Sequence, residues 1–186
     1  MRALRDRQLK ASEQIQTARL LLRRPVATDA EAIFRCYASD PVVTRYLSWP
    51  THRSVADTQA FLARDETEWQ KWPAGSYLVY LREDNRLLGG TGLSFKTPTQ
   101  AATGYVFAQD SWGQGYATET LKAMVDLARL TGLQRLEAVC HIDHKPSARV
   151  MEKCGFQLEA TLREGAVFPN LDLGVRSDML VYAVAL

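Results

Sequence analysis

The chain has 186 residues, of which 46% are hydrophobic and 24% charged, and its formal net charge is +2. The composition indicates an ordinary globular protein and the length indicates one domain. The small charge does not by itself argue for nucleic-acid binding, and we expect no direct binding of this kind. A membrane-spanning helix needs about 20 apolar residues, and no apolar run in the sequence approaches this length. We therefore expect no membrane segment, and we expect a cytoplasmic location.

Residues 1–16 begin the chain with a basic stretch that lacks the apolar centre of a signal peptide. We expect this stretch to be a frayed extension of a single domain that spans 1–186. The three cysteines, Cys36, Cys140 and Cys154, are odd in number and far apart in the sequence. They therefore predict no disulfide framework.

The rest of the chain is predicted from its apolar periodicity, its turn residues and its helix caps. Alternating or short apolar runs predict strands over 18–25, 76–83, 86–95, 102–108, 133–142, 157–163 and 177–186. Apolar residues at helical spacing predict helices over 28–37, 54–72, 116–130 and 146–154. This order indicates a mixed sheet with helices on its faces, an α+β fold.

A glycine-containing turn, "WGQGYATE" at 112–119, lies between one predicted strand and the next predicted helix. A helix N-terminus offers about four unpaired amides and a partial positive charge, so it favours an anion such as a phosphate. The same glycines also suit an ordinary tight turn. A dinucleotide fingerprint would need glycine where Thr118 stands, and no Gly-Lys-Ser/Thr of a P-loop occurs.

A second motif, "HIDHKPSARVMEKCGF" at 141–156, follows the next strand. Together the motifs resemble the GNAT superfamily of acyl-CoA-dependent N-acyltransferases, and most closely its RimJ/RimL-like branch of ribosomal-protein N-terminal acetyltransferases. That branch typically has T-x-R-L-x-L-R, W-G-x-G-Y-A-T-E, N-x-x-S and E-K-x-G-F in this order. The corresponding segments here are "TARLLLR" (17–23), "WGQGYATE" (112–119), "HKPS" (144–147) and "EKCGF" (152–156).

The resemblance implies a mixed, V-shaped central sheet flanked by helices on both faces, in which the parallel strands 102–108 and 133–142 splay apart. It implies acetyl-CoA as the acyl donor, with the pantetheine arm along the first of these strands and the pyrophosphate on the amides of the glycine turn. The coenzyme-binding residues that it implies are Val106, Phe107, Ala108, Trp112, Gly113, Gln114, Gly115, Tyr116, Ala117, Thr118, His144, Arg149 and Lys153.

Lys145, Arg149 and Lys153 recur every four residues and so predict a basic stripe along one short helix. The stripe is either a contact for the coenzyme's phosphates or a solvated face. His144 stands where the family usually has asparagine, and it can hydrogen-bond the pantetheine or titrate near neutrality.

For the chemistry, Ser147 matches the serine that protonates the leaving thiolate in the RimL-like branch. Its alternative role is that of a first-turn serine that satisfies helix amides. Glu164 lies near the region where relatives place a catalytic glutamate, so it is our candidate base. A water relay or a base carried by the substrate is the alternative.

The acceptor is expected to be a primary amine, because a chain N-terminus, with a pKa near ~8, loses its proton more easily than a lysine near ~10.4. We expect a protein N-terminus, such as that of a ribosomal protein, or a small-molecule amine. The donor could instead carry succinyl or another acyl group. Tyr46 and Trp49 are candidate acceptor contacts in this family's arrangement, whereas Trp69 is predicted to lie in the core.

The rival hypotheses are a non-catalytic coenzyme-binding module and, more distantly, a nucleotide-binding oxidoreductase. No metal is expected, because the spacing of Cys140, His141, Asp143 and His144 fits no standard zinc site. Strand alternation also directs Cys140 and His141 to opposite faces. The protein is expected to be a monomer or a homodimer.

Overall fold

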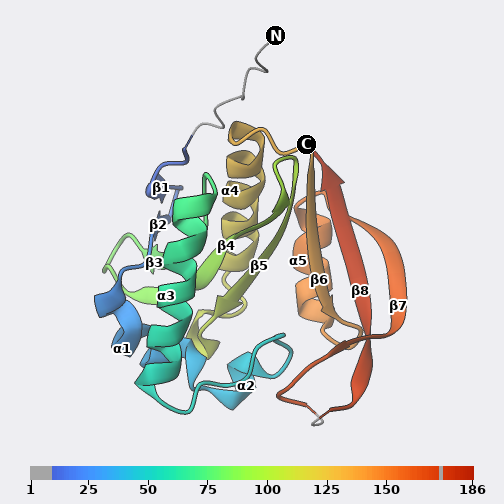
Figure 1. Ribbon diagram of the computed structural model, residues 1–186, viewed down its shortest axis with the longest axis horizontal. Coiled ribbons are helices and arrows are strands. Elements are labelled where there is room, and N and C mark those ends of the chain that lie inside the picture. The colour runs from blue at the N-terminus through green and yellow to red at the C-terminus, as the bar shows by residue number, and fades with distance from the viewer. Residues whose placement is uncertain (1–9, 172–173) are drawn as a thin grey trace.

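The computed structural model describes residues 10–171 and 174–186, and the first nine residues of the expected extension lie outside this range. Within the described residues, eight strands form one sheet in the order β1-β2-β3-β4-β5-β6-β8-β7 (Figure 1). The strands are β1 (Gln14–Gln16), β2 (Leu20–Arg23), β3 (Ser76–Leu81), β4 (Leu87–Thr97), β5 (Gln100–Phe107), β6 (Arg135–His141), β7 (Gln157–Val167) and β8 (Arg176–Ala185).

The helices are α1 (Ala30–Ile33), α2 (Pro41–Thr44), α3 (Val55–Lys71), α4 (Tyr116–Leu130) and α5 (Lys145–Lys153). A π-helical turn, Phe34–Ala38, continues α1, and short 3-10 turns occupy Ala27–Asp29 and Gln109–Ser111. In the part of the chain that the structure describes, no helix is both long and apolar enough to cross a membrane.

The centre of the sheet is V-shaped. Strands β5 and β6 are the parallel pair, and their register covers only Gln100–Ala102 opposite Arg135–Glu137. Beyond these residues the two strands diverge, and α2 lies at their diverging end (Figure 1). The β6-facing edge of β5 from residue 103 to 107 therefore has no strand partner, which confirms the predicted splay.

Helices cover both faces of the sheet, as expected. On β3, Tyr77 and Val79 belong to the large buried cluster that contains the apolar face of α4. The alternate residues Leu78 and Tyr80 pack with α1 and with Leu62 of α3. Because successive strand residues point to opposite faces, these two clusters lie on opposite sides of the sheet. Trp69 is 2% exposed, so its predicted place in the core is confirmed.

Two elements differ from the sequence prediction. Gln14–Gln16 form β1 and pair with β2, so the expectation of a frayed extension is wrong for these residues. This strand has one apolar residue, Ile15, and its order comes from pairing to β2 rather than from a pattern of its own. The short helix α2 was also missed, although Asp40 caps it by accepting a hydrogen bond from the amide of Val42 at 2.8 Å.

Candidate active site

The glycine turn offers a row of free backbone amides. Gly113 and Gly115 have φ of 75° and 81°, in the left-handed region that favours glycine, and α4 begins at Tyr116. None of the amides of 113–118 donates a hydrogen bond to a residue that the structure describes. A side-chain Cβ built on Gly113 would meet nothing within 4 Å, so the turn is open on that side. Such a turn fits an anionic group.

Contacts on both sides hold this turn. The indole N–H of Trp112 donates to the carbonyl of Phe107 at 2.7 Å, which ties the turn to the end of β5. On the other side, the Cys154 thiol lies 3.5 Å from the carbonyl of Thr118, so the end of α5 adjoins the first turn of α4. Arg149 and Lys153 are exposed on α5, with no ion pair to any described residue. Their charges are therefore not neutralised by an ion pair within the described residues.

Ser147 is bonded across the diverging strands rather than to its own helix. Its Oγ lies 2.9 Å from the hydroxyl of Tyr105 on β5, and that hydroxyl also donates to the Ser147 carbonyl at 3.1 Å. Burial raises the pKa of Tyr105 above its ordinary value, so the phenol keeps its proton. The interpretation of Ser147 as a helix cap is therefore not what the structure shows. Sequence reasoning missed Tyr105 because nothing in its own strand marks it.

An aromatic stack lies at the diverging end of β6. The ring of Tyr46 is 5.0 Å from that of His141 and 4.9 Å from that of His144, and both pairs are stacked. Phe168 meets the edge of His141 at 4.9 Å. Burial, and then the neighbouring His141, lower the pKa of His144 below its ordinary 6.5, so this imidazole is neutral at pH 7.

Two predicted residues lie away from this stack. Trp49 packs at the edge of the cluster between α1 and α3, and its ring is 5.1 Å from that of His52. Glu164 is exposed in a bulge of β7 with a φ of 47°, and β8 separates β7 from β6. The structure therefore brings Tyr46, His144 and Ser147 to the diverging strands, whereas Glu164 lies on the edge strand β7. Trp49 packs against the cluster on the α1 and α3 side of the sheet, against which Val106 of β5 also packs.

Asn170 holds the segment that carries Tyr46 and was not singled out from the sequence. Its side-chain amide donates to the carbonyls of Thr44 and Trp49 at 2.7 and 2.8 Å. Its carbonyl oxygen accepts from the amide of Thr51 at 2.7 Å. One side chain thus fixes both ends of the 44–51 segment that carries Tyr46.

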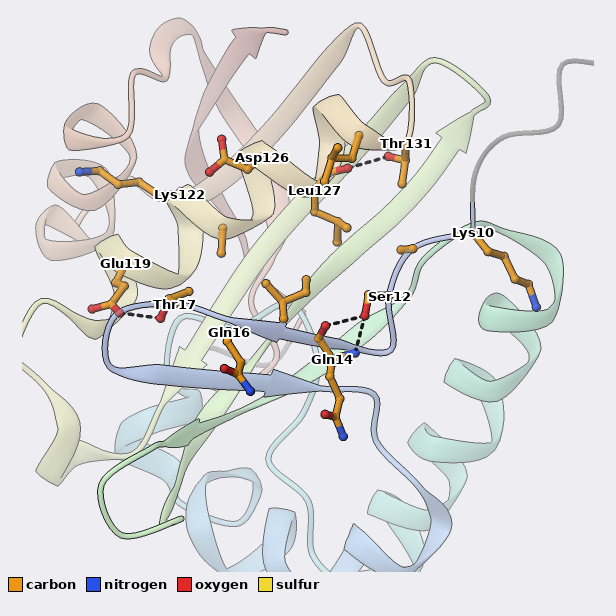
Figure 2. Close-up of a pocket in the computed structure, with 14 residues that line it drawn as sticks. Lys10, Ser12, Gln14, Gln16, Thr17, Glu119, Lys122, Asp126, Leu127 and Thr131 are labelled. Carbon is orange, nitrogen blue, oxygen red and sulfur yellow. Dashed lines mark hydrogen bonds between the residues drawn. The ribbon is translucent and has the colours of Figure 1, made fainter.

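A separate groove of about 710 Å³ runs between the β1 segment and α4 (Figure 2). Its floor is mainly apolar, with Ile15, Ala123 and Leu127 among its lining residues. None of the residues predicted to bind the coenzyme lines it. This groove is therefore distinct from the space between the diverging strands.

A splayed parallel pair beside an open glycine turn is the arrangement that the resemblance to N-acyltransferases using acetyl-CoA implied. The sequence matches the acetyltransferase (GNAT) domain family over residues 19–157, and the chain belongs to this family. It is therefore an acetyl-CoA-dependent acyltransferase, as the resemblance implied.

Individual relatives agree with this assignment. The chain is 30% identical over 173 residues to the uncharacterized N-acetyltransferase YoaA of Bacillus subtilis (strain 168), covering 91% of this chain and 95% of that protein. A GNAT-family acetyltransferase from Bacillus anthracis is 27% identical with a TM-score of 0.79, over 92% of this chain and 98% of its own. RimL, the ribosomal L7/L12 alpha-N-protein acetyltransferase, shares the fold with a TM-score of 0.82 at 24% identity, over 94% of both chains.

Proposed function

We propose that this protein transfers an acetyl group from acetyl-CoA to the α-amine of a protein N-terminus. The observation that carries the proposal is the hydroxyl pair of Ser147 and Tyr105, 2.9 Å apart, on the two sides of the diverging strands. Tyr105 belongs to the strand whose free edge would bind the pantetheine, and Ser147 follows His144 of the aromatic stack by three residues. The likeness to RimL supports the same general arrangement.

The coenzyme would be held by backbone rather than by side chains. The unpaired amides of 113–118 would bind the pyrophosphate, and the free edge of β5 from 103 to 107 would pair with the pantetheine as an added strand would. Arg149 and Lys153 would face the outer phosphates. This arrangement would direct the thioester toward Ser147.

Ser147 would act as the acid. When the amine nitrogen attacks the thioester carbon, the C–N bond forms and the C–S bond breaks, and the leaving thiolate takes the hydroxyl proton of Ser147. Tyr105 would fix the serine rotamer: its phenol keeps its proton because burial raises its pKa, and donates a hydrogen bond to the Ser147 carbonyl. Its oxygen is then free to accept from the Ser147 hydroxyl until the thiolate takes the serine proton. The base takes the proton that the amine loses and passes it to the serine oxygen, which restores the neutral serine.

The proposed class of acceptor follows from the low basicity of the group that would take the amine proton. His144 is neutral at pH 7 with a lowered pKa, so it is a weak base, and Glu164 remains a second candidate on the edge strand. A weak base suits an amine that is already partly neutral. An N-terminal amine has a pKa near ~8, whereas a lysine side chain is near ~10.4.

A panel of peptides tests this acceptor. Each peptide contains one lysine and is made in two forms, one with a free N-terminus and one with a blocked N-terminus. The enzyme is given acetyl-CoA and one of these peptides at a time, and the acetylated position is mapped by mass spectrometry. We expect acetylation at the free N-terminus and none at the lysine. Lysine acetylation, or turnover only with small-molecule amines added in parallel, would refute the proposed acceptor. Thiol release without any amine product would refute the transfer itself.

The two candidate bases are compared in the same assay. His144→Asn and Glu164→Gln each remove a proton acceptor with little change in size. If His144 takes the proton, its variant loses activity most at the lower end of the pH range, where less of the amine is already neutral. An unchanged pH profile in His144→Asn, with a loss in Glu164→Gln, would assign the role to Glu164.

A further inference from the structure

The first sequence motif, at 17–23, has a partner in the glycine-turn motif. The Glu119 carboxylate, in the first turn of α4, accepts from the Thr17 hydroxyl at 2.6 Å and from the Arg19 amide at 2.8 Å through one oxygen. Its other oxygen accepts from Nε of Arg19 at 2.7 Å. The Thr17–Glu119 bond closes one end of the groove between β1 and α4 (Figure 2).

The Arg19 side chain then reaches the turn itself. Its guanidinium donates to the Gln114 carbonyl at 3.0 Å and lies 4.7 Å from the ring centre of Tyr116. One of its nitrogens is 3.5 Å from the place where a Cβ on Gly115 would lie. Arg19 therefore contacts Gln114 and Tyr116 on either side of Gly115, and Glu119 fixes its orientation.

This contact has a direct consequence for the backbone amides. In a trans peptide the C=O and the N–H point in opposite directions, and none of the described peptide bonds is cis. With the Gln114 carbonyl held toward Arg19, the Gly115 N–H points to the opposite side of the turn. That is the side on which an anion can approach without meeting the Arg19 side chain.

The arginine acts here by geometry rather than by attraction. Its charge is balanced by Glu119 at 2.7 Å. Partial burial works against the charged carboxylate, but the bonds from Thr17 and Arg19 outweigh it and lower the pKa of Glu119 below its ordinary value. A neutralised ion pair has little long-range field, so steering of the coenzyme falls to residues such as Arg149 and Lys153.

We propose that Arg19 is a positioning residue for the acyl donor: through Thr17, Glu119 and the Gln114 carbonyl it holds the 113–117 turn with its amides directed at the pyrophosphate. The inference rests on the proposed coenzyme site. It assigns a role to the 17–23 motif, which lies far from the reacting atoms, and it separates the pyrophosphate contacts from the chemistry at Ser147.

The positioning role is tested with two acyl donors, acetyl-CoA and S-acetylpantetheine. The second donor carries the thioester and the pantetheine arm but lacks the pyrophosphate. The variants are Arg19→Gln, the milder Thr17→Val, and Arg129→Gln as the matched control. Arg129 lies in the last turn of α4, at the opposite end from Glu119, and forms an ion pair with Asp126 at 3.2 Å. The kcat/KM is measured with each donor, and the Kd of coenzyme A is measured by calorimetry without any acceptor.

We expect Arg19→Gln to weaken coenzyme A binding and to lower kcat/KM for acetyl-CoA by about tenfold, the effect of losing one charge-assisted hydrogen bond. The kcat/KM for S-acetylpantetheine should not change, and Thr17→Val should move in the same direction by less. Arg129→Gln should alter neither donor. Circular dichroism and a thermal scan report whether each variant is folded.

The outcomes separate the two proposals. If the unaltered enzyme uses both donors equally well, the turn does not bind the pyrophosphate and the proposed coenzyme site is wrong. If the unaltered enzyme has the higher kcat/KM with acetyl-CoA, and Arg19→Gln keeps the same ratio of kcat/KM values and the same Kd for coenzyme A, the positioning role is wrong. If both donors fall equally in Arg19→Gln, the residue supports the fold as a whole, which also overturns the inference.

Discussion

Tyr105→Phe removes one hydroxyl and leaves the ring packed in place. That hydroxyl makes two hydrogen bonds to Ser147, at 2.9 Å to Oγ and 3.1 Å to the carbonyl. Both bonds join β5 to the first turn of α5 across the diverging strands. The substitution therefore tests whether this pair carries both stability and catalysis.

Each of the two bonds contributes about 1 kcal/mol net, so the free energy of unfolding should fall by about 2 kcal/mol. For a domain of this size that lowers the unfolding midpoint by about 4–8 °C. The serine hydroxyl also loses the partner that fixes its rotamer, so kcat should fall by about tenfold. The KM for acetyl-CoA should change by less than about twofold, since the proposed binding contacts are made by backbone groups elsewhere.

The assay is a thermal scan together with steady-state release of free thiol at saturating acetyl-CoA. Tyr182→Phe is the matched control, because the Tyr182 hydroxyl also anchors α5 to the sheet, by donating to Glu152 at 2.9 Å. That control should lower the midpoint without lowering kcat. If Tyr105→Phe keeps the kcat of the unaltered enzyme while its midpoint falls, the hydroxyl is structural and the reasoning about Ser147 positioning is refuted.

Three further predictions follow from the same site. Ser147→Ala should lower kcat by about 100-fold, the usual contribution of a general acid, and leave the Kd of coenzyme A within about twofold by calorimetry. Gly113→Ala should cost about 1 kcal/mol for its positive φ, by chemical denaturation, and should also weaken coenzyme A binding, since its methyl group enters the anion site. Glu119→Gln should make the free energy of unfolding depend less on pH at acid pH. The pKa of Glu119 lies below its ordinary 4.5 in the fold, so its contribution is complete above that value and is lost as the pH falls through the folded-state pKa.

Each of these three predictions has a control variant or a result that would contradict it. Gly132→Ala has a similar φ of 79° at the end of α4 and meets nothing within 4 Å, so it should cost the same stability without changing coenzyme A binding. Equal losses of affinity in both glycine variants would remove Gly113 from the site. Unchanged turnover in Ser147→Ala would remove the serine from the mechanism. Parallel stability curves for Glu119→Gln and the unaltered protein between pH 3 and 6 would show that the network around Arg19 is weak.

Local signals in the sequence determined the order of the main elements and the place of the anion-binding turn. Helix caps, apolar periodicity and glycines act on neighbouring residues, so they can be found in a single stretch of chain. Thus α4 begins directly after Gly115, and the predicted hairpin of β3 and β4 turns at Asn85, which has a φ of 56°. The splay of β5 from β6 was expected from the family resemblance rather than from any local pattern.

Contacts between distant segments were decided by the tertiary structure alone. Thr17 and Glu119 are 102 positions apart, and Tyr105 and Ser147 are 42 apart, and neither pair leaves a periodic signal. The strand β1 was missed for the same reason, because its order comes from its neighbour β2. A hydrogen bond depends on where two side chains meet in space, and that meeting is set by the packing of the whole sheet and its helices. The sequence by itself therefore determined the kind of enzyme and the place of its glycine turn, while the fold determined which residues hold that turn and Ser147 in position.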